Sequence, residues 1–128
     1  MSFLKNIFGN NEPQKEESKM EWFPLNEINQ LDEIIAESKE NPVLIFKHST
    51  RCIISRTVLK NFEKKFDLEG KVKPYFLDLL EFRPISNEIA SLFNVTHQSP
   101  QLILVKDGKA IYNASHDNIE VKDLKNYI

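Results

Sequence analysis

Cysteine is nearly absent from the sequence. Its 128 residues include one cysteine, Cys52, so no disulfide can form within the chain. That count fits a reducing compartment and excludes a disulfide-stabilised secreted fold. One cysteine and three scattered histidines also lack the ligand spacing of a metal site. We therefore predict no metal and no tightly bound cofactor.

Neither a strong excess of one charge nor a long hydrophobic run is present. The formal net charge is −2 and the isoelectric point is about 5.9, which gives no indication of nucleic-acid binding. The apolar stretches are too short to cross a bilayer, and the N-terminus lacks the apolar run and cleavage site of a secretory signal. We expect a cytoplasmic, monomeric protein without membrane association.

The N-terminal segment has few residues able to form a core. Residues 9–19 are almost entirely polar, so we predict a flexible tail and linker at residues 1–19, followed by one domain at residues 20–128. Phe3, Leu4, Ile7 and Phe8 fall on one face of a short helical turn before the linker. Two interpretations stay open for them, a loosely ordered terminus and a docking peptide for a partner or a membrane surface, of which the membrane is the weaker because only Lys5 is nearby.

Strand and helix patterns alternate along residues 20–128. The predicted strands are 21–25, 43–46, 72–78, 101–106 and 110–114. Pro24 favours an edge position for the first of them. The predicted helices start at the cap Asn26, near Cys52, at Pro84, and at the cap Asp117 or Asn118.

The order βαβαβαββα defines an α/β fold class. Alternating strands and helices give parallel strand pairs with right-handed crossovers. Asp107-Gly108 suits a tight hairpin turn, so the last two strands should be antiparallel. We predict a thioredoxin-like domain, with a mixed central sheet and helices on both faces.

Cys52 is the residue most suited to chemistry. A lone cysteine is most often an inert buried residue. Cys52, however, follows the buried strand 43–46 and opens a helix, where unpaired backbone N–H groups and the helix dipole stabilise a thiolate. Arg51 and Arg56 add positive charge nearby. A thiolate in such a setting is a nucleophile.

Serine stands where a second redox cysteine would be expected. Ser55 is three residues after Cys52, in the first turn of the predicted helix. A thiol at that position attacks a mixed disulfide on the first cysteine, and a hydroxyl cannot. We expect the Ser55 hydroxyl to donate a hydrogen bond towards the Cys52 sulfur. The pattern predicts a one-thiol oxidoreductase.

Ser99-Pro100 precedes the strand 101–106, at the place where thioredoxin-like folds carry a cis-proline that faces the active cysteine. We therefore predict a cis peptide bond there, although cis is rare among X–Pro bonds. His48 and His97 are expected to border the same groove and to exchange protons near the thiol. The candidate substrate-binding residues are Ser99, Pro100, Arg51, Arg56, His48 and His97.

The decapeptide FKHSTRCIIS, residues 46–55, resembles the signature of the monothiol bacilliredoxins of the bacillithiol system. The resemblance extends over about residues 20–128 and includes the Trp22 region and Ser99-Pro100. One position departs from the pattern, since Ile53 stands where family members often carry Pro or Gly. A β-branched residue there narrows the approach to the sulfur.

The resemblance implies a function. A bacilliredoxin removes bacillithiol, a low-molecular-weight thiol, from S-bacillithiolated client proteins. Carried onto this chain, Cys52 is the nucleophile, Ser55 the non-resolving fourth position and Pro100 the cis-proline. Bacillithiol is then a redox co-substrate, and regeneration needs an external thiol or another redox protein.

Two other functions stay open from the sequence. Monothiol glutaredoxin-like proteins that carry an iron–sulfur cluster also use Cys-x-x-Ser, typically with Gly after the cysteine, so Ile53 and Ile54 argue against that function. The second is a non-catalytic thioredoxin-like binding module in which Cys52 is incidental. Fast alkylation of Cys52 at pH 6 would exclude this second function.

Overall fold

The computed structural model describes residues 20–128, and the tail predicted for residues 1–19 lies outside the described residues. Its elements in chain order are β1 (Phe23–Pro24), α2 (Gln30–Glu37), β2 (Val43–His48), α3 (Ile53–Lys65), β3 (Lys73–Asp78), α4 (Arg83–Leu92), β4 (Gln101–Lys106), β5 (Lys109–Ser115), η1 (His116–Asn118) and α5 (Val121–Leu124). Apart from the short 3-10 turn η1, this order is the predicted βαβαβαββα.

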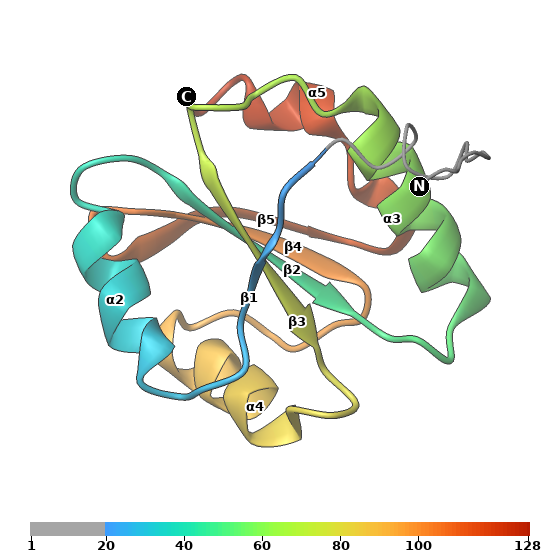
Figure 1. Ribbon diagram of the computed structural model, residues 1–128, viewed down its shortest axis with the longest axis horizontal. Helices are drawn as coiled ribbons and strands as arrows, with labels where there is room; N and C mark the ends of the chain where they lie inside the picture. Colours follow the sequence, from blue (N-terminus) through green and yellow to red (C-terminus); the bar gives the residue numbers. More distant parts are fainter. Residues whose placement is uncertain (1–19) are drawn as a thin grey trace, which may run out of the picture.

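The strands form one mixed sheet in the order β1-β3-β2-β4-β5 (Figure 1). β1, β3 and β2 run parallel, whereas β4 is antiparallel to β2 and β5 is antiparallel to β4. The predicted α/β fold class is therefore confirmed, including the edge position of the strand that contains Pro24. β2 is the central strand, and the chain that leaves its end enters the Cys52 region.

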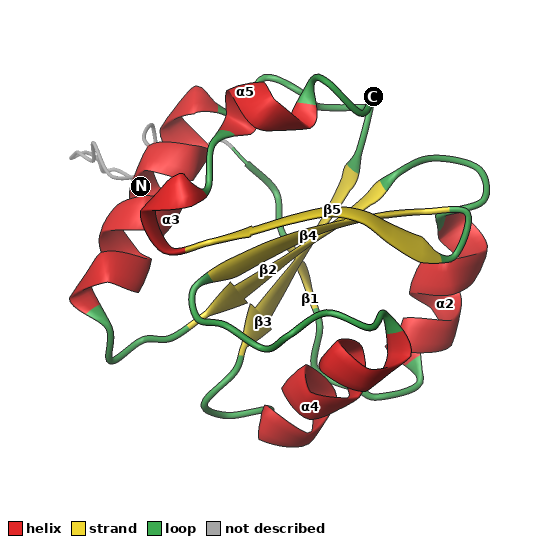
Figure 2. Ribbon diagram, turned by 180° about the vertical axis from the view of Figure 1, so that it is seen from behind, coloured by secondary structure: helices red, strands yellow, loops and turns green. Residues whose placement is uncertain are grey.

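Two layers of helix cover the sheet. Helices α2 and α4 lie on one face, and α3 and α5 lie on the other (Figures 1 and 2). Each face has its own cluster of buried apolar side chains. β2 supplies both, because successive side chains of a strand point to opposite faces. Ile45 belongs to the α2–α4 cluster, whereas Leu44 and Phe46 belong to the α3–α5 cluster.

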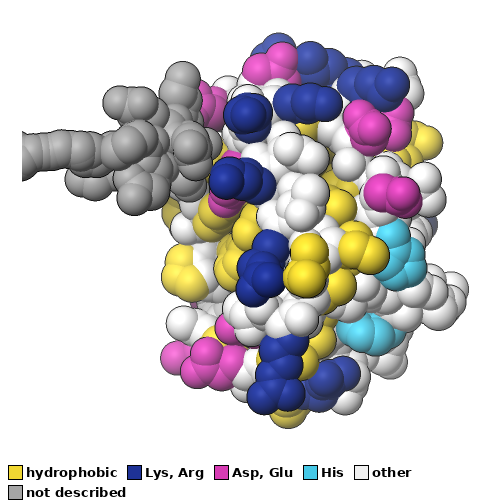
Figure 3. Space-filling view, turned by 90° about the vertical axis from the view of Figure 1, so that its right-hand side faces the viewer, with side chains coloured by type: hydrophobic (Ala, Val, Ile, Leu, Met, Phe, Trp, Pro, Cys, Tyr) yellow, Lys and Arg dark blue, Asp and Glu magenta, His cyan; other side chains and the backbone are white. Residues whose placement is uncertain are grey.

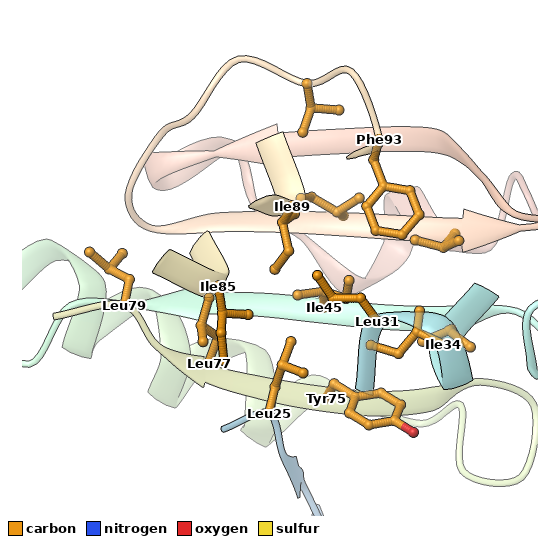
Figure 4. Close-up of a cluster of buried hydrophobic side chains, with 14 residues drawn as sticks. Leu25, Leu31, Ile34, Ile45, Tyr75, Leu77, Leu79, Ile85, Ile89 and Phe93 are labelled. Atoms are coloured by element: carbon orange, nitrogen blue, oxygen red, sulfur yellow. The ribbon is translucent and has the colours of Figure 1, made fainter. Parts of the chain in front are cut away.

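The α2–α4 cluster is shown in Figure 4. Ile34, Ile45, Leu77, Ile89 and Ile103 within it are fully buried. Burying a side chain of this size contributes about 1.5–3 kcal/mol to folding. The helices are therefore held by their apolar faces, and the ends of the strands are fixed in place beneath the loops that carry Cys52 and Pro100.

The hairpin between β4 and β5 turns at Asp107-Gly108, as predicted. Both residues have positive φ, 54° and 77°, as a two-residue hairpin turn of the favoured type requires. Ser38, at the end of α2, accepts the Asp107 N–H on its backbone oxygen and the Gly108 N–H on its hydroxyl. These bonds fasten the turn to the neighbouring helix.

The start of the first helix differs from the prediction. Asn26 is not its cap, because α2 begins at Gln30 with Asn29 at the N-cap. The Gln30 side chain reaches back instead, and its Oε1 accepts the N–H groups of Asn26 and Glu27. Ile28 lies before the start of α2 and is 51% exposed. A side chain inside the helix therefore caps the preceding turn.

The last helix is shorter than predicted, and neither Asp117 nor Asn118 caps it. Both lie in the 3-10 turn η1, and α5 begins at Val121 with Glu120 at its N-cap. Ile119 and Glu120 have an extended backbone between η1 and α5, so no continuous helix starts at either predicted cap. Among the described residues, none of the helices is long and apolar enough to cross a membrane.

Candidate active site around Cys52

Cys52 occupies the N-cap of α3, as predicted. Its backbone is extended, its N–H donates to Ser49 O at 3.2 Å, and its carbonyl accepts the Arg56 N–H at 3.1 Å. The side chain is half-buried. No acidic residue lies in the first turn of α3, so the free N–H groups and the positive end of the helix dipole face no competing carboxylate there.

The two predicted arginines lie close to this turn. Arg51 and Arg56 are both exposed. Arg56 Nη1 donates to Thr50 O at 3.4 Å, which holds its guanidinium over the loop that leads to Cys52. Two positive charges therefore lie near Cys52: Arg56, which bonds to the loop, and Arg51, which is part of the turn.

Ser55 is fully buried and has other partners than the one expected. Its Oγ accepts the Ser49 N–H at 3.1 Å and lies 2.8 Å from His48 Nδ1. The hydrogen bonds of the described residues include none from Ser55 to the Cys52 sulfur. Ser55 therefore braces the loop 49–52 from the first turn of α3, and Cys52 is held through its backbone.

His48 ends β2 and is buried beneath this loop. Burial lowers the pKa of His48 below its ordinary value of 6.5, and Arg56 acts in the same direction, whereas Asp78 opposes the shift. The ring packs between Phe46 and Phe76, with centroids at 6.5 and 5.4 Å. When the proton of the neutral His48 ring is on Nε2, Nδ1 accepts a hydrogen bond from the Ser55 hydroxyl, which itself accepts the Ser49 N–H.

Ser55→Ala is expected to lower the free energy of unfolding by about 1–3 kcal/mol, because it leaves the buried Ser49 N–H and His48 Nδ1 without a partner. Urea denaturation measures this change. Ser91→Ala, on the exposed face of α4, is the matched control and should cost little. Equal losses in the two variants would contradict the bracing role.

Ser99-Pro100 has a cis peptide bond, which confirms the prediction. Pro100 is buried, and its carbonyl accepts the His116 N–H at 3.0 Å from the end of β5. Ser99 Oγ is buried and has no hydrogen-bond partner among the described residues. The segment is thus held at its C-terminal side, while one polar atom just before the proline is unpaired.

The structure does not bring His97 and His48 together. His97 Nδ1 lies 3.3 Å from Lys47 Nζ and 3.4 Å from Ser86 Oγ, on the α4 side of the sheet. His48 points to the α3 side, because it follows Lys47 along the strand and successive side chains alternate. The shared groove expected for the two histidines is not formed by their side chains.

Lys47 is the site residue that the sequence pattern did not single out. Its side chain is fully buried, and Nζ donates to Ser86 O at 3.1 Å. Burial lowers the pKa of Lys47 from 10.5 to about 8. The available signal was the position of a lysine directly after the apolar run 43–46, where the strand continues for two more residues.

The free energy of unfolding is expected to rise by up to about 3 kcal/mol between pH 8 and 10.5 because of Lys47. In this window the folded state holds Lys47 neutral while the unfolded chain still binds the proton, so higher pH favours folding. Comparison with Lys47→Met isolates the effect, since the other titrating groups are common to both proteins. Parallel pH profiles for the two proteins would contradict it.

A groove of about 410 Å³ begins one residue from Cys52, between α3 and the segment η1–α5. Ile53 and Ile54 line it and are 70% and 54% exposed. On the face that carries α3, apolar side chains gather between Lys and Arg side chains (Figure 3). Within residues 20–128, no three His, Cys, Asp or Glu side chains are placed to hold a metal ion.

Residues 23–124 match the family described as monothiol bacilliredoxin BrxC. The chain belongs to the monothiol bacilliredoxin family. Membership agrees with the geometry, because the only thiol of the chain caps a helix and a serine follows three residues later. This bacilliredoxin-family chain is thus of the thiol–disulfide oxidoreductase class, and its partners are redox partners that carry thiols.

Solved structures support the fold of this bacilliredoxin-family chain. A protein described as having a thioredoxin fold is 33% identical, with a TM-score of 0.70, over 81% of this chain and 90% of that one. Thioredoxin from Malassezia sympodialis is 18% identical, with a TM-score of 0.65, over 83% of this chain and 86% of that one. Mitochondrial thioredoxin 3 from Saccharomyces cerevisiae is 20% identical, with a TM-score of 0.60, over 82% and 91%.

Proposed function

We propose that the protein removes bacillithiol from S-bacillithiolated proteins, with Cys52 as the nucleophile and bacillithiol as the redox co-substrate. The observation that carries the proposal is the half-buried thiol at the N-cap of α3, followed by Ser55 in place of a resolving cysteine, in a chain of the monothiol bacilliredoxin family. A thiol in that position favours the thiolate, which is the attacking form.

The first step exchanges one disulfide for another. The Cys52 thiolate attacks the bacillithiol sulfur of the mixed disulfide, a bond forms between the two sulfurs, and the client sulfur leaves as a thiolate that takes a proton from water. Cys52 then carries bacillithiol. No net oxidation or reduction has occurred, because one S–S bond has formed and one has broken.

The second step needs an external thiol. The described residues hold only one sulfur that can exchange, and Ser55 cannot displace the cap. A bacillithiol thiolate attacks the bacillithiol sulfur of the mixed disulfide, the Cys52 thiolate leaves, and bacillithiol disulfide is formed; another redox protein can take the same place. Cys52 is exposed enough for this exchange, since its side chain is half-buried and Ile53 beside it points into solvent.

Three features favour binding of a capped client at this surface. The groove beside Ile53 offers an apolar bed, the Arg51 and Arg56 side chains offer cations, and Ser99 offers its backbone groups next to Pro100. His48, bonded to Ser55 beneath the loop, supports the loop that carries Cys52.

A competition between caps tests the proposed function. One model protein is capped with bacillithiol or with glutathione, and the release of its free thiol and the gain of the cap on Cys52 are followed by intact mass spectrometry. We expect kcat/KM to favour the bacillithiol cap by at least about tenfold, roughly 1.4 kcal/mol of differential binding. A preference for glutathione would assign the protein to the glutaredoxin-like function, and no transfer from either cap would leave the binding-module function.

A further inference from the structure

Two buried polar side chains face each other across the centre of the sheet. Lys47 on β2 pairs with Gln101 on β4 in the antiparallel ladder, and both are fully buried. Directly opposed residues in such a pair project from the same face. Lysine and glutamine are rarely fully buried, because each must exchange its hydration for hydrogen bonds inside the protein.

Both side chains bind the same short loop. Lys47 Nζ lies 3.3 Å from His97 Nδ1, Gln101 Nε2 donates to Thr96 O at 2.9 Å, and the Gln98 N–H donates to Gln101 Oε1 at 3.4 Å. Three consecutive loop residues are therefore each held by a buried side chain from one of two neighbouring strands. Ser99-Pro100 follows at once.

The groups around His97 Nδ1 determine which partner donates in its hydrogen bond with Lys47. His97 Nδ1 faces the Lys47 ammonium and the Ser86 hydroxyl, both of which donate, so Nδ1 is the acceptor and the ring proton is on Nε2. Burial lowers the pKa of His97, and the positive charges of Lys47 and Arg83 act in the same direction. The neutral ring that accepts from Lys47 is thus the favoured form.

Stability alone does not account for a lysine in this place. An apolar side chain of similar length would fill the space without the desolvation of an ammonium. The loop is also fixed from its other side, since the Pro100 carbonyl accepts the His116 N–H. The polar contacts of Lys47 and Gln101 fix loop 96–98, and the bond to His116 fixes Pro100. Ser99 lies between these two fixed points.

We infer that Lys47 and Gln101 are positioning residues, which hold loop 96–98 so that Ser99 and Pro100 meet the thiol partner of Cys52. Neither side chain touches the substrate, because both are buried behind the loop. The inference rests on the proposed function for the choice of substrate. It adds residues on the opposite face of the sheet from the His48–Ser55 pair.

The test separates positioning from nucleophilicity. Lys47→Met keeps the length of the side chain and removes its donors. We expect the KM for the capped model protein to rise about tenfold or more while kcat changes less than about threefold, as for loss of binding that is shared by ground state and transition state. Alkylation of Cys52 by iodoacetamide, a small reagent that needs no loop, should keep its wild-type rate.

Lys106→Met is the matched control, because Lys106 is an exposed lysine of the same sheet. It should leave KM unchanged. An unchanged KM in Lys47→Met would overturn the inference, and so would an equal fall in transfer and alkylation, which marks a general structural defect. Transfer by the wild type in the same assay tests the proposed function separately. The KM of each variant is compared with that of the wild type for whichever cap the wild type accepts.

His97→Ala provides a second route to the same contact without changing the core. His97 is a half-buried loop residue, and its loss removes the hydrogen-bond acceptor of Lys47. The variant therefore tests the positioning role even if Lys47→Met does not fold. The KM should rise as in Lys47→Met, and in the double variant it should rise no further, because the two residues act through one contact. Additive increases in KM would contradict the positioning role.

Discussion

Cys52→Ser is expected to reduce the transfer of the bacillithiol cap to the uncatalysed rate. The chain has no other cysteine, and a serine hydroxyl does not attack a disulfide at neutral pH. Serine is among the preferred N-cap residues, so the change should leave the free energy of unfolding unchanged or raise it by a few tenths of a kcal/mol to about 1 kcal/mol. Intact mass spectrometry and urea denaturation measure the two effects.

The combination of lost transfer and retained stability is the decisive part of that result. Ser91→Ala, a small change at an exposed position on α4 that does not line the groove, should retain transfer and serves as the control. Transfer above background in Cys52→Ser would place the nucleophile outside this chain. A large loss of stability would mean that the thiol contributes to packing, as it does in a structural cysteine.

Ser55→Cys is expected to convert the protein into one that resolves its own mixed disulfide. Residue 55 lies in the first turn after the capping residue, so a thiol there competes with external thiols as an intramolecular nucleophile. Effective molarities of well-placed groups far exceed the millimolar thiol of an assay, so the capped form should decay about 100-fold faster or more. Time-resolved mass spectrometry without added thiol should show the cap leave as a disulfide forms between Cys52 and the introduced thiol.

Ser55→Ala separates the new thiol from the loss of the hydroxyl. Both variants remove the hydroxyl that accepts the Ser49 N–H, but only the cysteine can attack. The cap should persist in Ser55→Ala as long as in the wild type. Ser55 now bonds to His48 and Ser49, so the introduced thiol must adopt a different rotamer to reach the Cys52 sulfur. Equal persistence of the cap in Ser55→Cys would show that residue 55 does not reach that sulfur.

The parts of the fold that follow local patterns could be predicted from the sequence. The apolar run 43–46 indicates a strand covered on both faces, Asp107-Gly108 indicates a hairpin, and the position of Cys52 after a short loop indicates a helix cap. Chain connectivity then fixes which pairs are parallel. The cis bond before Pro100 could be predicted because the strand order places that proline at a known point of the fold.

The remainder depended on contacts between residues far apart in the chain. The prediction ended the strand at Phe46, whereas the ladder continues to His48, and alternation then sends Lys47 and His48 to opposite faces. The bond from Lys47 to Ser86 spans 39 residues, so no local spacing reports it. The bond from the His116 N–H to Pro100 O is likewise a contact that no local spacing reports.

The last two residues of β2 contact both loops of the candidate active site. His48 contacts the loop that carries the thiol, and Lys47 contacts the loop that carries the proline, from adjacent positions on the central strand. The spacing between thiol and proline is therefore set by backbone that has hydrogen-bonded neighbours on both sides. Amide protons in this stretch should exchange through global unfolding rather than local opening. Substitutions in the outer helices can then alter which clients bind while the reacting groups keep their separation.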